Sequence, residues 1–381
     1  MKVAIAGGGV GGLTLALALV QRDVDVSVYE QAAEFGQVGA DVNLTPNSTR
    51  ALDGLSSQVG EKLREIGAKP KRRLSRRWDS GEITSDLPMS DAAEQKYGAP
   101  QLTVHRAGLL DSLRSLLPES VLRLGHRLDR FENLDDHVRL HFSSGHHAIG
   151  ADVLIGADGI HSVVRDGLFG EQDAEYTGVV AYRAVIPTSQ LEGVSNLDSF
   201  TKWWGPDPGR QLVTFPLNSG NDLFVFATVA ESEWAAESWT TSAEASEFRE
   251  QYADFHSDVR SILGACGKVM KSALRVREPM PTWSKNRVSL LGDACHPMTP
   301  FMAQGAGQAI EDAVVLCRAL TEHRELAIPE RLISYEDARR KRTARIQMKS
   351  RANDWLRCGD EADWLYLYDA WNVQLTQPAA A

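Results

Sequence analysis

Five of the first twelve residues are glycine, and their spacing is the first feature of this sequence that implies chemistry. Gly7, Gly9 and Gly12 satisfy the pattern G-x-G-x-x-G between an apolar strand-like segment and an apolar helix-like segment. The first glycine of this pattern permits a tight turn, the second lets a pyrophosphate approach the backbone, and the third lets helix and strand pack closely. The segment therefore predicts a dinucleotide site at Gly7, Gly9, Val10, Gly11 and Gly12.

An acidic residue stands where such a site needs one. Val24–Glu30 is a predicted strand, and Glu30 ends it roughly 20 residues after the glycines. A carboxylate at this position accepts hydrogen bonds from a ribose 2′-hydroxyl and disfavours a 2′-phosphate. The site is therefore expected to bind FAD or NAD rather than NADP, with Glu30 and Gln31 beside the adenosine ribose.

Two later motifs favour FAD over NAD. Asp158 follows a predicted buried strand in the motif ADG, and Gly292-Asp293 follows another such strand. A second glycine-rich segment then leads into a predicted helix. FAD is the longer cofactor, and it needs a second acid for its ribityl chain and a helix N-terminus near the flavin ring. The candidate contacts are Asp158, Gly292, Asp293, Pro300, Gln304, Gly305, Ala306 and Gly307.

Three motifs, GGGVGG, ADG and GDACHPMTP, together resemble those of the single-component (class A) FAD-dependent aromatic hydroxylases. These enzymes share the p-hydroxybenzoate hydroxylase fold, and the resemblance covers essentially the whole chain. It is closest to the branch of salicylate hydroxylase and 6-hydroxynicotinate 3-monooxygenase, through KWW at Lys202–Trp204, MAQGAGQAIEDA and DWLYLYDAW. It implies an α/β fold, in which a Rossmann-like FAD-binding domain (GR2 type) carries an inserted, mainly antiparallel β-sheet substrate domain and a C-terminal helical tail.

The resemblance also implies roles for matching residues. Arg106, in the segment VHRAGLL, would contact the pyrophosphate and ribityl region of FAD, and Asp293 would hold the ribityl hydroxyls. Asp158 would serve both FAD and NAD(P)H. Pro300 and residues 304–307 would lie along the isoalloxazine edge, where the N-terminus of the next helix can stabilise a reduced, anionic flavin.

The reaction implied by the resemblance is a ring hydroxylation. NAD(P)H reduces the flavin, O2 adds to it, and a flavin C4a-hydroperoxide delivers a hydroxyl group to an electron-rich ring. In the closest branch, attack at a carboxyl-bearing carbon expels CO2. We therefore expect an NAD(P)H-dependent FAD monooxygenase that acts on a small aromatic carboxylate such as salicylate. The sequence has no second glycine fingerprint, so NADH and NADPH both stay open as the transient co-substrate.

Two other functions stay open. One is a hydroxylase of an N-heteroaromatic ring, of the 6-hydroxynicotinate or urate kind, and the other is a flavin oxidase or sensor that hydroxylates nothing. Relatives that act on 6-hydroxynicotinate place histidines where Asn43 and Phe301 stand. Asn43 cannot act as a base and Phe301 makes the site less polar, which favours a benzoate. The sequence identifies no catalytic residue.

The substrate should lie between the flavin loop and a β-rich segment. Strand alternation places Arg210 and Thr214 on one face, and the planar fork of Arg210 suits a substrate carboxylate. The alternative is that Arg210 is a solvated cation at a strand end. The candidate pocket residues are Asn43, Tyr182, Arg183, Phe200, Trp203, Arg210, Thr214, Phe215 and Phe301.

The pattern of strands and helices divides the chain into four predicted segments. These are a first FAD-binding part (1–175), a β-sheet substrate domain (176–270), a second FAD-binding part (271–350) and a helical tail (351–381). Helices are expected at 11–21, 104–117, 243–252, 258–263, 304–319 and 333–351. The tail is rich in tryptophan and tyrosine, which suits either packing against the FAD-binding domain or a contact between subunits.

Composition excludes several classes of protein. The net charge of −10 argues against a nucleic-acid partner. The four cysteines form no CxxC pair and no metal-binding spacing, so we expect no metal and a reducing, cytoplasmic location. We expect no signal peptide and no membrane span, and either a monomer or a homodimer. The basic run Lys69–Arg77 is expected to be a solvated strand or loop face.

Overall fold

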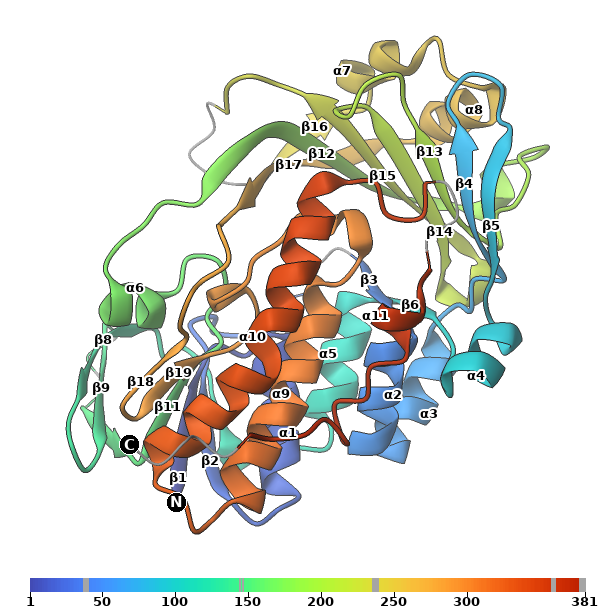
Figure 1. Ribbon diagram of the computed structural model, residues 1–381. Coiled ribbons are helices and arrows are strands. Elements are labelled where there is room, and N and C mark those ends of the chain that lie inside the picture. The colour runs from blue at the N-terminus through green and yellow to red at the C-terminus, as the bar shows by residue number, and fades with distance from the viewer. Residues whose placement is uncertain (37–40, 144, 146, 235–239, 358–360, 377–381) are drawn as a thin grey trace.

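A six-stranded sheet carries the glycine turn. The computed structural model describes residues 1–36, 41–143, 145, 147–234, 240–357 and 361–376 (Figure 1). The strands of this sheet, in spatial order, are β18 (Ser284–Lys285), β19 (Val288–Leu290), β11 (Val153–Gly156), β1 (Lys2–Ala6), β2 (Asp25–Tyr29) and β7 (Leu122–Arg123). Neighbours run parallel except at the β18–β19 edge. Parallel strands with connecting helices are the expected architecture of a dinucleotide-binding sheet.

Buried helices cover this sheet. The apolar helix α1 (Val10–Val20) packs against α9 (Gly305–Glu322) and α5 (Arg106–Arg114). It is apolar on nearly every side because almost every residue in it is buried. The long helix α10 (Ile328–Ala352) lies along α9 and extends towards a second sheet (Figure 1). The helices α1, α9 and α10 confirm those expected at 11–21, 304–319 and 333–351, although α10 begins earlier than expected.

The second sheet has eight strands. In spatial order they are β16 (Thr240–Glu244), β17 (Lys268–Val276), β12 (Glu175–Pro187), β15 (Asp222–Ala230), β14 (Gln211–Leu217), β13 (Phe200–Trp204), β4 (Arg72–Arg77) and β5 (Ile83–Pro88). Every neighbouring pair in it is antiparallel except β13–β4. The inserted, mainly antiparallel sheet is therefore confirmed, and it is larger than the sequence indicated.

The two faces of the eight-stranded sheet have different neighbours. On what we call the outer face, Trp203 and Leu212 pack with residues of α7 (Ser246–Arg249) and α8 (Ser257–Ala265). On the inner face, Phe200 and Phe215 pack with Phe301, which belongs to the short helix η6 (Pro300–Met302) before α9. The inner face is therefore the one turned towards the predicted flavin loop.

Smaller elements complete the fold. The pair β3 (Asp41–Leu44) and β6 (Leu102–His105) forms an antiparallel ribbon, which we call the β3–β6 ribbon. The remaining elements are α2 (Pro46–Leu55), α3 (Ser57–Ile66), α4 (Asp91–Tyr97), β8 (Leu128–Asn133), β9 (Val138–Phe142), β10 (Ile149–Ala151), α6 (Val163–Phe169) and α11 (Asp363–Tyr366). None of the helices within the described ranges has the length and apolar character needed to cross a bilayer.

Two predicted helices were wrong in extent. The helix expected at 104–117 begins as strand β6, and α5 occupies only Arg106–Arg114. The helix expected at 243–252 begins as the end of β16, because those residues pair with β17. Strands β4 and β5 join the large sheet from inside the segment assigned to FAD binding, and β17 runs past residue 270. The four-segment division stays a prediction.

The basic run Lys69–Arg77 is not a solvated face. Most of it forms β4, which is paired on both sides, and Arg73 and Arg76 are buried. The Arg73 guanidinium lies 4.3 Å from the centroid of the Phe200 ring, and that of Arg76 lies 4.2 Å from the Trp203 ring. Strand alternation sends these two cations to opposite faces, where aromatic rings cover both.

The C-terminal tail packs back onto the FAD-binding part. Arg50 of α2 donates hydrogen bonds to the backbone oxygens of Tyr97, Tyr366 and Tyr368. The indole N–H of Trp371 donates to Ala51 O at 2.9 Å. Of the two roles considered for the aromatic tail, packing against the FAD-binding part is therefore the one observed.

Replacing Tyr366 by alanine should lower the free energy of unfolding by about 3 kcal/mol, because a fully buried aromatic side chain leaves a cavity. Tyr366 packs edge-on against Tyr97, with ring centroids 5.3 Å apart. Leu367→Ala is the matched control at the next position, where the side chain is half exposed, and it should cost less than about 0.5 kcal/mol. Urea unfolding of both holoproteins measures the difference, and equal losses would contradict a docked tail.

Candidate active site

The glycine turn between β1 and α1 leaves no room for side chains. Gly7 has φ +105°, and a Cβ atom there would lie 2.4 Å from Ala157 O. A Cβ atom on Gly12 would lie 2.1 Å from Gly7 O. At the start of α1 no described side chain caps the backbone at Gly9. The first N–H groups of α1 are therefore available to an anion such as a pyrophosphate.

Glu30 stands at the carboxyl end of β2, beside this turn. Its carboxylate accepts hydrogen bonds from Gly8 N at 2.7 Å and from Ala32 N at 2.9 Å. The next residue, Gln31, is exposed. This is the position that a ribose-binding acid takes at the end of the second strand.

Residues far apart in the sequence meet beside Gly9. A Cβ atom on Gly9 would lie 3.8 Å from Arg106 Nη2, and one on Gly305 would lie 4.0 Å from Asp293 Oδ1. The Asp293 side chain has exposed surface. Burial by the surrounding protein nevertheless raises the pKa of its carboxyl, and the charges of His296 and Arg106 offset only part of this rise. A carboxylate that protein surrounds but does not cover lines a recess. Gly9, Arg106, Asp293 and Gly305 therefore border one recess.

The loop before α9 presents backbone to the same recess. Ala303 has φ +56°, which turns the chain into the helix. Gln304 is fully buried, and its side chain donates to Thr45 Oγ1 at 2.7 Å instead of capping α9. The first N–H groups of α9, at Gly305 and Ala306, are thus left for an acceptor outside the helix. Pro300 is exposed at the start of η6.

Asp158 in the ADG motif holds a helix start. Its carboxylate accepts hydrogen bonds from Ser162 Oγ at 2.5 Å and from Val164 N at 3.2 Å, at the start of α6. Burial raises the pKa of Asp158, and these hydrogen bonds lower it. The side chain that caps α6 is Ser162, whereas the neighbouring His161 is exposed. A role of Asp158 towards FAD or NAD(P)H stays a prediction.

The inner face of the large sheet is an aromatic wall. The rings of Phe200 and Phe215 stack with centroids 5.4 Å apart, and Phe215 and Phe224 stack at 4.8 Å. Arg183 stands on this face with its guanidinium 5.2 Å from the centroid of the Phe226 ring, and it donates a hydrogen bond to Ser272 Oγ. Phe301 of η6 packs against this wall. Arg183, Phe200, Phe215 and Phe301 are thus brought together as the sequence analysis expected.

Four other pocket candidates lie on the outer face, away from Phe301. Tyr182 stacks on Phe248 of α7, and Trp203 stacks on His256 before α8. Thr214 alternates with the inner-face residue Phe215 and shares the face of Leu212. Arg210 at the strand end is held by Asp207 at 2.8 Å, by Gln251 O at 2.9 Å and by Asp254 at 3.6 Å. We leave Tyr182, Trp203, Arg210 and Thr214 out of the proposed pocket.

Comparison with known proteins identifies the family. Residues 1–350 match the family described as "FAD binding domain". The chain is 36% identical to 6-hydroxynicotinate 3-monooxygenase of Pseudomonas fluorescens, over 99% of this chain and 97% of that protein. This chain belongs to the FAD-dependent aromatic hydroxylases. It is also 35% identical to 3-amino-4-hydroxybenzoate 2-monooxygenase of Streptomyces cremeus, over 92% of this chain and 86% of that protein.

Solved structures agree on the fold of the hydroxylase. A salicylate hydroxylase substrate complex superposes with a TM-score of 0.85 at 25% identity, and the match covers 100% of this chain and 99% of that one. The predicted family, fold class and enzyme class are therefore confirmed: the protein is a flavoprotein monooxygenase that hydroxylates aromatic rings.

FAD fits the residues that the hydroxylase presents. The glycine turn, Glu30 and the recess at Arg106 and Asp293 offer anion, ribose and ribityl contacts, and the uncapped start of α9 offers N–H groups to the flavin. Bound FAD supplies the redox chemistry with O2 and with NAD(P)H, the co-substrate typical of this family. These residues would bind the cofactor and orient it.

A buried ion network lies directly behind the flavin loop of the hydroxylase. Glu311 and Asp312 are fully buried on α9. Arg339 of α10, itself fully buried, binds both at 2.7 Å, and Arg342 binds Glu311 at 2.9 Å. Asn47 of α2 donates to Glu311 at 2.6 Å. The network therefore ties α2, α9 and α10 together.

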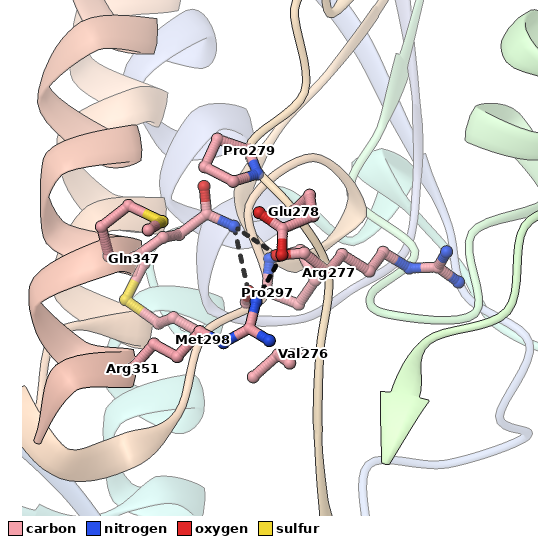
Figure 2. A pocket seen from close by; sticks show the side chains of 9 residues that line it. Val276, Arg277, Glu278, Pro279, Pro297, Met298, Gln347 and Arg351 are labelled. Atoms are coloured by element: carbon pink, nitrogen blue, oxygen red, sulfur yellow. Dashed lines mark hydrogen bonds and ion pairs between the residues drawn. The ribbon is translucent and has the colours of Figure 1, made fainter. Parts of the chain in front are cut away.

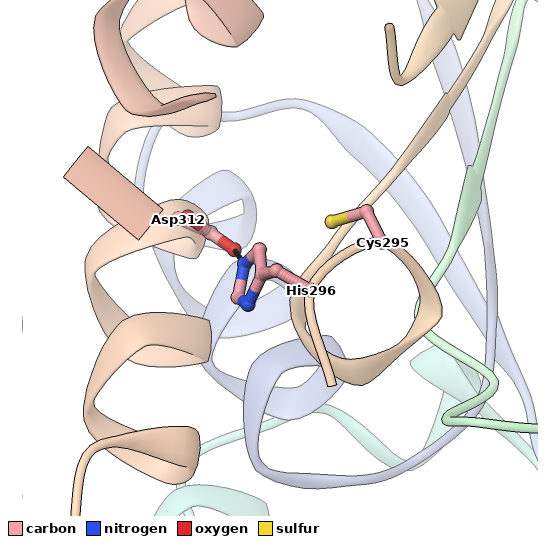
Figure 3. Close-up of side chains that lie close together, drawn as sticks. All are labelled: Cys295, His296 and Asp312. Carbon is pink, nitrogen blue, oxygen red and sulfur yellow. Dashed lines mark hydrogen bonds and ion pairs between the residues drawn. The ribbon is translucent and has the colours of Figure 1, made fainter. Parts of the chain in front are cut away.

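Cys295, His296 and Asp312 place three potential metal-ligand atoms within 4.8 Å of one another (Figure 3). His296 Nε2 and both Asp312 oxygens are paired within the protein, whereas His296 Nδ1 has no partner among the described residues. His296 Nε2 pairs with Asp312 Oδ2 at 2.5 Å, and Asp312 Oδ1 accepts from Arg339. Burial raises the pKa of the Cys295 thiol well above its usual value, which favours the neutral thiol over a ligating thiolate. We assign this cluster to packing.

A small pocket lies where the end of β17, the segment after His296 and the helix α10 meet (Figure 2). It is lined by residues 276–279, Pro297, Met298, Gln347, Met348 and Arg351. Gln347 Nε2 donates to Pro297 O at 3.1 Å across it. Its volume of about 230 Å³ includes solvent at the mouth, and ligand sites usually enclose about 300 Å³ or more. It contains none of the predicted pocket residues.

The sequence analysis missed four polar side chains around the aromatic wall. Lys202, buried on the inner face, lies 3.6 Å from the Trp204 ring centroid and 5.3 Å from that of Phe301, and it donates to Asn353 Oδ1 at 2.7 Å. Burial lowers the pKa of Lys202 well below its usual value, and the charges of Arg73 and Arg357 lower it further. Strand alternation along KWW places the side chains of Lys202 and Trp203 on opposite faces of the sheet, so the sequence already contained a signal for the position of Lys202. The other three are Arg73, Asp41 and Gln101.

Proposed function

We propose that this flavoprotein hydroxylates a small aromatic carboxylate that bears a ring hydroxyl, with NAD(P)H and O2 as co-substrates. The observation that carries the proposal is the position of Arg183. This cation stands on the aromatic inner face, and the same face packs against Phe301 of the flavin loop. An arginine on an aromatic wall suits a planar ring with a carboxylate, because the ring packs on apolar surface while the guanidinium pairs with the charge.

The side chains around Arg183 can orient such a ring. Phe215 and Phe224 offer flat apolar surface, and Phe301 comes from the element that leads into the start of α9. A ring held here would face the part of the recess that the loop before α9 borders. Arg183 is held in turn by Ser272 on β17, so its guanidinium has a defined direction.

The substrate within this class is proposed from relatives. Their printed names include 6-hydroxynicotinate, 3-amino-4-hydroxybenzoate and 3-hydroxybenzoate as well as salicylate, and each is an aromatic carboxylate. A benzoate such as salicylate, with loss of CO2, is our first candidate because Phe301 makes this wall less polar and Asn43 cannot act as a base. A hydroxylated pyridine carboxylate is the second, favoured by two relatives at 36% and 38% identity.

The proposed function is tested by NADH and NADPH oxidation by the purified holoenzyme, with salicylate, 3-hydroxybenzoate or 6-hydroxynicotinate added. Stimulated oxidation with a hydroxylated product in the mass spectrum supports it, and loss of CO2 with gain of one oxygen identifies a decarboxylating hydroxylase. Stimulation by none of them, or peroxide formation alone, contradicts the proposed function.

The cysteines at 266, 295 and 317 are buried and unpaired, which supports a reducing, cytoplasmic location as a further proposal.

Arg183→Met should raise the KM for the aromatic carboxylate by about 10- to 100-fold, because a charge-assisted hydrogen bond contributes about 1.5–3 kcal/mol. Arg210→Met is the matched control, since Arg210 pairs with Asp207 on the outer side of the sheet. It should leave the KM within about twofold. Steady-state kinetics of both variants at full FAD content decide the matter. A larger effect at Arg210 would return that residue to the pocket.

A further inference from the structure

We infer that Asp41 is the base that removes the proton of the substrate's ring hydroxyl. The inference rests on the proposed function, and it supplies the catalytic group that sequence analysis did not identify. Three observations carry it: the side of the β3–β6 ribbon on which Asp41 stands, the half-buried carboxyl of Asp41 within reach of the charge of Arg183, and the unsatisfied amide groups on the same side of the ribbon.

The side of the ribbon follows from the strand register. Asp41 and Asn43 stand two residues apart on β3, so their side chains lie on one side of the ribbon. Asn43 is opposite Thr103 of β6, and directly opposed residues share a side. Thr103 Oγ1 donates to Pro216 O of β14 at 2.5 Å. The side that carries Asp41 therefore faces the large sheet.

The surroundings of the Asp41 carboxyl are those of a general base. Burial is the main cause that raises its pKa and the charge of Arg183 lowers it, which leaves a pKa of about 7. The side chain is nevertheless only half-buried, so protein surrounds it without covering it. Burial also lowers the pKa of Arg183, which the charge of Asp41 raises. Each of the two groups therefore lies within reach of the charge of the other. A base with a pKa near neutrality is effective at physiological pH.

Other charges near β3 do not change this assignment. The ionisable groups on the elements packed against β3 are His105 of β6, Arg106, Asp111 and Arg114 of α5, Arg50 and Asp53 of α2, and Glu311, Asp312, Cys317, Arg318 and Glu322 of α9. Among them and Arg183, only Arg183 shifts the pKa of Asp41 through its charge. The acids at the core of α9 are paired with Arg339, and Asp53 is paired with Arg64.

Two amides beside this carboxyl have unused hydrogen-bonding atoms. Gln101 is fully buried and Asn43 is 7% exposed. Gln101 Nε2 donates to Asn43 Oδ1 at 2.9 Å, which leaves Asn43 Nδ2 and Gln101 Oε1 without a partner among the described residues. Turning both amides over leaves again one donor and one acceptor. Because buried polar atoms are rarely left unpaired, this pair is suited to a ligand that both accepts and donates, as a hydroxylated ring does.

The proposed step is a single proton transfer. The O–H bond of the ring hydroxyl breaks, an O–H bond forms on an Asp41 carboxylate oxygen, and the electron pair stays on the ring oxygen. The resulting phenolate is a stronger ring nucleophile than the phenol, and the positive charge of Arg183 lowers the cost of forming it next to the substrate carboxylate. The proton leaves Asp41 to solvent through the exposed part of its side chain.

The test is the pH dependence of kcat/KM for the holoenzyme, with whichever of salicylate, 3-hydroxybenzoate and 6-hydroxynicotinate is turned over fastest. The wild-type profile should rise through about pH 7, because the carboxylate must be ionised to accept a proton. Asp41→Asn should remove this rise and lower kcat/KM at pH 8 by about 100- to 10,000-fold. Asp41→Glu should keep a rise at a shifted pH. Asp25→Asn, an exposed aspartate that likewise begins a short strand, should behave as the wild type.

A spectroscopic readout separates proton transfer from turnover. With NAD(P)H omitted, 3-hydroxybenzoate bound to the oxidised holoenzyme at pH 8 should show a phenolate absorbance in the wild type and a phenol absorbance in Asp41→Asn. A wild-type enzyme that hydroxylates while Asp41→Asn keeps both the pH profile and the rate within about threefold would overturn the role of Asp41 and leave the proposed function standing. A wild type that hydroxylates none of the three carboxylates would overturn the proposed function and the base together.

Discussion

Arg339→Met should lower the free energy of unfolding by about 3–5 kcal/mol, because it leaves two buried carboxylates without their shared cation. The Arg339 guanidinium binds Glu311 and Asp312 at 2.7 Å each and Gln308 Oε1 at 2.7 Å. All of these side chains are fully buried, so water cannot replace the lost contacts. Denaturant unfolding of the holoprotein measures the loss.

The adjacent residue provides the matched control. Arg340 lies on the same helix, is half-buried, and pairs with Glu336 at 3.5 Å and Asp337 at 3.9 Å. Arg340→Met should cost less than about 1 kcal/mol. Combining R339M with E311Q and D312N should recover a large part of the loss, since the stranded charges are gone. A small loss in R339M, or no recovery in the triple variant, would contradict a network held together by charge.

The same network predicts a pH dependence. Burial alone would raise the pKa of Asp312, but the charges of His296 and Arg339 outweigh it and lower the pKa to about 2. A carboxyl whose pKa is lower in the folded than in the unfolded state stabilises the fold above the unfolded pKa of about 4. That stability is lost as the pH falls from about 4 towards 2. The stability gap between wild type and R339M should therefore narrow below about pH 4, because the wild type loses there the stability that ionised Asp312 contributes.

Gly12→Ala should weaken FAD binding by about 10- to 100-fold, since overpacking of this kind costs about 1.5–3 kcal/mol. The added Cβ atom would lie 2.1 Å from Gly7 O, which is a backbone atom and cannot rotate away. The strand–helix turn must open, and with it the arrangement of N–H groups at the start of α1. Flavin content after purification and fluorescence titration with FAD measure the loss.

Gly264→Ala is the matched control for this substitution. A Cβ atom there meets nothing within 4 Å, and the residue lies near the end of α8. The exchange should be neutral or slightly stabilising, by up to about 1 kcal/mol, and should leave the flavin content unchanged. Equal loss of FAD in both variants would mean that the effect is general destabilisation. Full FAD content in Gly12→Ala would contradict the tight turn.

The FAD site was largely predictable because its parts are short and local. G-x-G-x-x-G needs only a strand, a turn and a helix that follow one another, and the carboxyl ends of neighbouring parallel strands meet at one edge of a sheet. Gly7, Glu30 and Asp293 each follow the carboxyl end of such a strand. Their residue types and their spacing in the sequence were therefore enough to indicate a dinucleotide and then FAD. Family resemblance extended this reading to Arg106, which the structure places beside Gly9.

The substrate wall was only half predictable. Alternation separates Thr214 from Phe215 and Trp203 from Lys202, but it does not say which set faces the flavin. That choice depends on which face α7 and α8 cover, and they cover the face that carries Tyr182. An arginine at a strand end and an arginine in mid-strand look alike in sequence, and only the neighbours of Arg210 and Arg183 distinguish them.

By itself the sequence determined the nucleotide sheet, the FAD fingerprint and the family, because these depend on residues close together along the chain. Other features depend on contacts between distant parts of the chain, and only the tertiary structure shows them. These are the pairing of β4 with β13, the burial of Arg73 under Phe200, and the ion network at Arg339. The tertiary structure also brought Asp41 and Arg183 close enough for the charge of each to act on the other. Their pairing depends on the packing of a two-stranded ribbon against a distant sheet, and no spacing along the chain encodes that distance.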